Sequence, residues 1–183
     1  MIISYDPEAT PTKQYPVAPE GMHDAVCVDV VDLGMKPQTF NGKTKEVPKV
    51  RLVWQIEDVD PETGWRLTVS QQYTASLWVD ESGKRMSKLR ETLKTWRGRD
   101  FTVEEAKHFE IETLVGINCQ IQVIHAPGSN GKVYANVNAV LPVRKGVIAL
   151  RPLDYTRVKD RPAKDNGNAA PRAAAPTDDD TPF

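Results

Sequence analysis

Residues 49–57, which read KVRLVWQIE, place an apolar side chain at every second position. These apolar side chains are Val50, Leu52, Trp54 and Ile56. A period of two over this length predicts a β-strand with one buried and one solvated face. After a short turn, residues 65–72 repeat the alternation, and their inward side chains are Trp65, Leu67 and Val69. The two stretches therefore predict a β-hairpin.

The residues before this hairpin predict one more strand and a long loop. Residues 22–33 alternate apolar side chains on both faces, and both faces are apolar enough to be buried. Residues 34–48 combine an Asn-Gly pair, a strong turn signal, with several lysines and Phe40, and predict a long basic hairpin loop. Four prolines within residues 1–20 predict an extended N-terminal arm, because proline prevents a regular helix.

The apolar period changes to that of a helix in residues 84–96. The stripe consists of Met86, Leu89, Leu93 and Trp96. Gly98 is placed to end this helix, and a capping box at Thr102 and Glu105 predicts a second, short helix. Residues 73–82, which precede the first helix, are predicted to form a loop.

Residues 118–125 and 132–140 predict a second hairpin, and residues 143–158 are a candidate for a further strand that closes the sheet. Three strands, a helical insertion and two more strands predict a mainly β domain. This order fits an OB-fold-like five-stranded antiparallel barrel with the helical insertion between the third and fourth strands. A small α+β sheet with helices on one side fits the same periodicities.

The composition divides the chain into a folded domain and a tail. We expect one domain over residues 21–158, and a disordered linker with an acidic tip over residues 159–183. The net charge of −1 hides a basic stretch at residues 83–99 and the acidic end. The two cysteines lie in apolar runs, and neither a signal peptide nor a membrane-spanning apolar run is visible. We therefore expect a soluble protein in a reducing, cytoplasmic compartment, with no membrane partner.

The last six residues, DDDTPF, combine three carboxylates with a terminal aromatic ring. A protein partner with an apolar slot rimmed by Lys or Arg would take the ring and pair the acids, so the tip predicts a partner-binding hook. The residues expected to bind this partner are Asp178, Asp179, Asp180, Pro182 and Phe183. The alternative is a solvated tail that only aids solubility.

The outward faces and loops of the predicted strands and the first helix carry cations and aromatic rings together. In a groove that binds single-stranded nucleic acid, cations hold phosphates and rings stack on bases. The candidate DNA-binding residues are Lys36, Phe40, Lys43, Lys45, Lys49, Arg51, Arg66, Tyr73, Trp78, Arg85, Lys88 and Tyr134. For each aromatic the alternative is packing in the core, where we expect Trp54, Trp65 and Trp96. No combination of residues predicts readout of base edges, so we expect little sequence preference.

Catalytic chemistry has little support in this sequence. The three histidines, His23, His108 and His125, lie far apart without Cys or carboxylate at ligand spacing, so neither a metal site nor a cofactor is predicted. An acidic cluster on a Pro-Gly turn comprises Asp58, Asp60 and Glu62. Acids at such turns usually serve solvation and turn geometry, so a metal-dependent nuclease is the weakest alternative.

The acidic tip resembles the C-terminal peptide of bacterial single-stranded-DNA-binding proteins, in which an acidic run ends in Pro-Phe and recruits replication and repair enzymes. Residues 87–102, 114–119 and 131–137 are similar to the single-stranded-DNA-binding proteins of some bacteriophages, whose fold is an OB barrel. The similarity implies a protein that coats single-stranded DNA in the host cytoplasm during replication or recombination, recruits host or phage enzymes through its tip, and is a candidate to form homo-oligomers. The alternative is an adaptor that binds only proteins.

Overall fold

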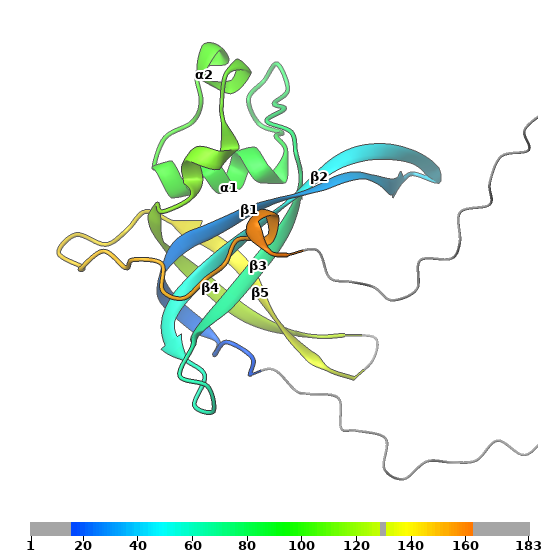
Figure 1. The fold of residues 1–183 in the computed structure, drawn as a ribbon. Helices are drawn as coiled ribbons and strands as arrows, with labels where there is room; N and C mark the ends of the chain where they lie inside the picture. Colours follow the sequence, from blue (N-terminus) through cyan, green and yellow to red (C-terminus); the bar gives the residue numbers. More distant parts are fainter. Residues whose placement is uncertain (1–15, 129–130, 163–183) are drawn as a thin grey trace, which may run out of the picture.

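The computed structural model describes residues 16–128 and 131–162, and their core is one antiparallel sheet of five strands (Figure 1). The strands are β1 (Gly21–Phe40), β2 (Lys43–Val59), β3 (Arg66–Thr74), β4 (Asn118–Pro127) and β5 (Val133–Leu141). They lie in the order β3-β2-β1-β4-β5, and each neighbouring pair is antiparallel. The predicted mainly β class and the five antiparallel strands are confirmed.

The sheet curves but does not close into a barrel. β3 and β5 are its edge strands, and no ladder of hydrogen bonds joins them within the described residues. A gap of about 770 Å³ lies between residues 68–70 of β3 and residues 131–135 at the start of β5. Residues 16–18 line the same gap, and Ala18 is buried. The prediction of a closed barrel is therefore wrong, because the N-terminal segment lies where a ladder between β3 and β5 would form.

β1 and β2 continue beyond the rest of the sheet as a two-stranded extension, here called the ribbon (residues 34–48; Figure 1). Their pairing is continuous from Gly34 to a two-residue turn at Asn41 and Gly42. Both turn residues adopt left-handed backbone angles, with φ of 49° and 73°, as a tight mirror-image hairpin turn requires. The predicted long loop is therefore wrong. The segment is polar because both of its faces are exposed, not because it lacks regular structure.

A bulge in β1 just after Cys27 divides its side chains between two layers. Val30 packs with Cys27 in the main core, whereas Val26 and Val28 form a second cluster with Val53 on the opposite face of the sheet. An unbroken alternation over residues 22–33 would place Val30 on the same face as Val28. That prediction is wrong, because the bulge inserts one residue and shifts the alternation.

Residues 143–161, here called the strap, cross the outer face of β1 and β2 without forming a strand (Figure 1, orange). Two side-chain amides take the place of a neighbouring strand. Gln55 exchanges two hydrogen bonds with the backbone of Leu153, at 2.7 and 2.9 Å. Asn118 does the same with Leu150, at 3.0 and 2.7 Å. The expected closing strand in this segment is therefore wrong, because side chains satisfy the backbone groups that a strand would offer to a ladder.

Short helices between β3 and β4 cover one end of the sheet (Figure 1). They are α1 (Lys88–Arg97), α2 (Val103–Lys107) and the 3₁₀ helix η1 (Ile111–Leu114), and a further 3₁₀ turn, η2 (Val158–Asp160), lies in the strap. The insertion point is as predicted, but α1 begins at Lys88 and not at residue 84. Ser87 caps its N-terminus, and Met86 pairs with Val79 in an isolated bridge.

Two helix ends follow their sequence signals. Gly98 ends α1 in the left-handed conformation, with φ of 70°. Thr102 and Glu105 form the predicted capping box at the start of α2. Among the described residues, no helix is long and apolar enough to cross a membrane.

The main core lies inside the curved sheet and against α1. Its largest fully buried side chains are Trp54, Leu52, Ile56, Leu93 and Ile121. Trp96 of α1 packs against Trp54 with ring centroids 6.1 Å apart, so both are core residues as predicted. Trp65 is 65% exposed, and its assignment to the core is wrong. The β2–β3 ladder becomes irregular near its end and stops at Arg66, so the alternation does not extend to Trp65.

Candidate nucleic-acid interface

The loop that joins β3 to α1 (residues 75–87) holds Trp78 with 54% of its surface exposed. The backbone at the two ends of the loop is paired. The Ser87 N–H donates to the Trp78 carbonyl over 2.9 Å, and Val79 pairs with Met86. An ordered backbone therefore presents this indole ring at the surface.

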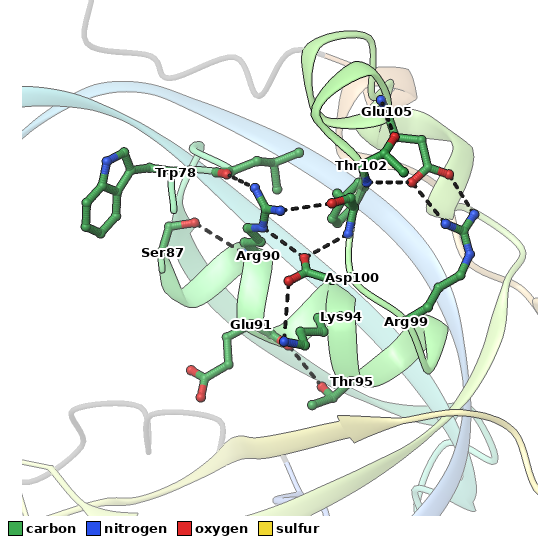
Figure 2. Close-up of polar contacts among 12 residues, drawn as sticks. Trp78, Ser87, Arg90, Glu91, Lys94, Thr95, Arg99, Asp100, Thr102 and Glu105 are labelled. Atoms are coloured by element: carbon green, nitrogen blue, oxygen red, sulfur yellow. Dashed lines mark hydrogen bonds and ion pairs between the residues drawn. The ribbon is translucent and has the colours of Figure 1, made fainter. Parts of the chain in front are cut away.

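Arg90 of α1 anchors the base of the loop (Figure 2). Its side chain is buried, and its guanidinium donates to the Leu77 carbonyl over 3.0 Å, to Asp100 Oδ1 over 2.9 Å and to the Phe101 carbonyl over 3.0 Å. Because Leu77 directly precedes Trp78, this network fixes the backbone that carries the exposed ring.

Asp80 closes the turn of the same loop. Its carboxylate accepts hydrogen bonds from the backbone N–H groups of Arg85 (3.2 Å) and Lys84 (3.0 Å) and from the Ser82 hydroxyl (3.0 Å). The bonds from Arg85, Ser82 and Lys84 hold the pKa of the Asp80 carboxyl below its usual value against a smaller effect of desolvation. The side chains of Lys84 and Arg85 consequently project from an ordered turn.

An open pocket of about 560 Å³ lies between this loop and α1. It is lined by Trp78, Lys84, Arg85, Met86, Glu91, Lys94 and Thr95. Lys94 Nζ lies 3.3 Å from Asp100 Oδ2 (Figure 2), and Glu91 pairs with Lys88 over 3.1 Å. Trp78 and Arg85, both predicted from the sequence, therefore line one pocket, and Lys88 lies beside it. The pocket combines an exposed ring with three cations and one carboxylate.

The ribbon carries further predicted cations. The exposed ones are Lys36, Lys43 and Lys45. At the base of the ribbon, Lys49 Nζ donates to Gln38 Oε1 over 2.5 Å and to Thr74 Oγ1 over 2.9 Å. The backbone of Phe40 adjoins the turn, whereas its side chain lies outside the part of the chain that the structure describes.

The strap covers part of the face that the sequence predicted to bind DNA. Arg51 is partly exposed near the ribbon, but Val53 is buried in the cluster under the strap and Gln55 is bonded to it. Arg66 donates to the Arg151 carbonyl over 2.9 Å, so its guanidinium contacts the strap backbone. The prediction that the polar face of β2 is open along its whole length is therefore wrong at Val53 and Gln55.

The strap brings cations that the sequence analysis did not assign. Its basic residues are Arg144, Lys145, Arg151, Arg157, Lys159 and Arg161, and its acidic residues are Asp154 and Asp160. The buried Asp29 carboxylate fixes the strap by accepting from Val158 N–H (2.8 Å), Arg157 Nε (3.0 Å) and Tyr155 Oη (3.2 Å). A charge count over this segment would have found the excess of cations, but nothing in the sequence around Asp29 predicts its role as acceptor.

Two predicted aromatic residues lie away from the pocket. Tyr73 is 4% exposed within β3, and burial raises the pKa of its hydroxyl, so its assignment to DNA binding is wrong. β3 continues to Thr74, and the alternation places Tyr73 inward. Tyr134 of β5 is exposed and lines the gap between β3 and β5. The structure therefore does not bring Tyr134 to the Trp78 pocket.

Within the described residues, no group of three or more His, Cys, Asp or Glu side chains is arranged to hold a metal ion. In the acidic cluster, Asp58 Oδ2 lies 2.8 Å from His23 Nδ1, and Asp60 accepts from the Glu62 N–H over 2.8 Å. Both acids therefore have local structural partners. The acidic tip, residues 178–183, lies outside the described residues.

Comparison with known proteins gives no family for this chain, since neither a protein-family model nor a curated protein matches it.

Proposed function

We propose that this protein binds single-stranded DNA with little sequence preference and coats it during replication or recombination. The observation that carries the proposal is Trp78, an exposed indole on an ordered loop, with Lys84, Arg85 and Lys94 around the same pocket. Exposed aromatic rings stack on bases and neighbouring cations neutralise phosphates in proteins that hold single strands.

The strand order supports an OB-type domain. An OB fold is a partly open five-stranded barrel that binds oligonucleotides on the face of its second and third strands and with the loops at its rim. The gap between β3 and β5 agrees with a partly open barrel. The ribbon, which the ends of β1 and β2 form and which carries exposed lysines, corresponds to one of these rim loops.

The ribbon and the pocket adjoin each other. Ala75, the first residue of the Trp78 loop, donates its N–H to the Pro48 carbonyl at the base of the ribbon over 2.9 Å. Lys49 follows Pro48 in the chain and bonds Thr74, the last residue of β3. One strand of DNA could thus contact the lysines of the ribbon and then reach the loop that carries Trp78.

The acidic tip supports a second role in the same proposal. Residues 178–183 would recruit host or phage replication and repair proteins, as the resemblance to bacterial single-stranded-DNA-binding proteins implies. Removal of these six residues should leave oligonucleotide binding intact and abolish capture of the recruited proteins from a host extract. A truncated protein that no longer binds oligonucleotide would place the tip in the DNA site instead.

Titration of a labelled oligonucleotide, with and without Mg²⁺, tests the DNA-binding role. A coating protein binds without cutting, an adaptor that binds only proteins ignores the DNA, and a nuclease degrades it. The affinity should fall with salt, with a log–log slope of roughly −0.7 per phosphate neutralised. Replacing both Lys43 and Lys45 by Gln should reduce the size of the slope by about 1.4, whereas the control Lys107→Gln on α2 should not change it. Binding that is insensitive to salt would contradict the proposal.

A further inference from the structure

We propose that the pocket between the Trp78 loop and α1 is a single-nucleotide subsite that stacks one base on Trp78 and, through Glu91, favours a base that carries an exocyclic amino group. The inference rests on the DNA-binding function proposed above and goes beyond it. It introduces a base preference at one position of an otherwise unselective interface.

The size and walls of the pocket suit one nucleotide. Its volume of about 560 Å³ lies within the range of roughly 300–1,000 Å³ typical of small-ligand sites. The Trp78 ring and the Glu91 carboxylate project to the same side of α1 (Figure 2), and both line the pocket. A base stacked on the indole would therefore direct one of its edges toward α1.

Cations around the pocket provide for the phosphate of that nucleotide. Lys94 is held at the pocket by Asp100, and the Asp80 turn holds the backbone of Lys84 and Arg85. Among the described residues, the ion pairs beside the pocket are Lys94–Asp100 and Lys88–Glu91, and neither of them includes Lys84 or Arg85. Both cations therefore remain available for a phosphate group.

Glu91 is the residue that distinguishes one base from another. Its Oε2 pairs with Lys88 over 3.1 Å, and its Oε1 accepts no hydrogen bond from any described residue. An ionised carboxylate only accepts hydrogen bonds. Cytosine and adenine present an amino group at the position where thymine presents a carbonyl oxygen, and the single donor of thymine, its N3–H, lies between two carbonyl oxygens, so Glu91 binds the first two more favourably than the third. The same carboxylate disfavours an acidic peptide as the occupant of the pocket.

Tryptophan fluorescence allows the subsite to be observed in the full-length protein. Trp54 and Trp96 are 0% and 5% exposed, so the Trp65→Phe variant leaves Trp78 as the one exposed indole among its three remaining tryptophans. Homopolymers of dC and dT of about twelve nucleotides lie within the site sizes of such domains. We expect both to quench Trp78, and dC to bind roughly 3- to 10-fold more tightly, the range for one net hydrogen bond.

The Glu91→Gln substitution should equalise the two homopolymers, because the amide can donate to the thymine oxygen as well as accept from the cytosine amino group. The matched control is Glu104→Gln on α2. Glu104 also pairs with a lysine three residues away, Lys107, at 2.9 Å, but it does not line the pocket. This control should keep the full preference for dC.

The outcomes separate the subsite from the broader function. If neither homopolymer binds, both proposals fail. If both bind without quenching Trp78, or if the dC preference is absent or survives Glu91→Gln, the DNA-binding function stands and the subsite is refuted. Quenching of Trp78 by a peptide that ends in DDDTPF, with no quenching by either homopolymer, would assign the pocket to the acidic tip and also refute the subsite.

Discussion

Replacing Asp29 by Asn should loosen the strap and destabilise the whole domain. The Asp29 carboxylate is 1% exposed, and it accepts hydrogen bonds from Val158, Arg157 and Tyr155 of the strap. Asn keeps the shape but removes the charge, and it turns an amide donor toward groups that themselves donate. The Arg157 guanidinium, 18% exposed, then loses its buried counterion.

The size of the effect follows from this burial. Breaking a buried ion pair by changing one partner costs about 3–5 kcal/mol. In Asp29→Asn the Val158 N–H and the Tyr155 hydroxyl lose their buried acceptor, and Arg157 keeps only the exposed Glu112 as a counterion. For a domain of this size, 1 kcal/mol corresponds to about 2–4 °C, so the melting temperature should fall by about 6–20 °C. Glu112→Gln is the matched control. Glu112 pairs with the same Arg157 over 2.7 Å but is 52% exposed, so its loss should cost at most about 1 kcal/mol.

Urea unfolding gives the free energy of unfolding, and limited trypsin digestion shows which segment is released. Trypsin should cut Asp29→Asn after Arg157 or Lys159 under conditions in which the native chain stays intact there. Burial raises the pKa of the Asp29 carboxyl, but the hydrogen bonds from Val158, Arg157 and Tyr155 outweigh it and hold the pKa below its usual value. Equal urea midpoints for Asp29→Asn and the native protein, or an equal loss in Glu112→Gln, would refute the reasoning.

Trp78→Ala should weaken oligonucleotide binding by roughly 1–3 kcal/mol without changing the melting temperature, since the ring is exposed. Tyr73→Ala should instead cost about 3–5 kcal/mol of stability, because this side chain is buried, and urea unfolding separates the two. Arg90→Met should cost about 3–5 kcal/mol and also weaken binding, since the guanidinium holds the Trp78 loop, and a loss of stability alone would exclude the second effect. Hydrogen bonds from Arg99 and from the Thr102 N–H lower the pKa of the Glu105 carboxyl to about 2. The stability that the ionised Glu105 contributes is therefore present at neutral pH and should be lost as the pH falls from about 4 to about 2, which acid titration of unfolding measures.

Much of the fold could be predicted from local patterns. The alternation in residues 49–57 places Trp54 in the core, the glycine at position 98 ends α1, and the capping box starts α2. Each of these signals is contained within a few residues, and tertiary contacts do not change it. A structural element can therefore be predicted from the sequence where its own residues determine its form.

The errors arose where distant segments decide the structure. Tyr73, predicted at the surface, is buried because β3 extends to Thr74. Trp65, predicted in the core, is exposed because the β2–β3 ladder stops at Arg66. The sequence of the ribbon predicts a loop because exposure on both faces removes the alternation that marks a strand. The strap depends on the amide side chain of Gln55, ninety-eight residues before its partner.

The sequence predicts which types of residue form the candidate site better than it predicts how these residues are arranged. A count of cations and aromatics identified Trp78 and Arg85, which line one pocket. It did not find Lys84 or Lys94, because their positions depend on the Asp80 turn and on Asp100. A stacking site needs a fixed ring beside fixed cations, and fixation comes from hydrogen bonds that composition does not record.

The charge of the strap decides whether it opposes or assists DNA binding. An acidic segment across the sheet would imitate DNA and compete for the cations of β2, but residues 143–161 carry six basic and two acidic side chains. Asp29 neutralises Arg157, whereas Lys145 and Arg151 remain exposed. A strap held on the sheet therefore extends the positive surface, and a released strap spreads the same charges over a flexible chain. Asp29→Asn should consequently weaken oligonucleotide binding at a temperature where the protein is still folded, and unchanged affinity would show that the strap lies outside the interface.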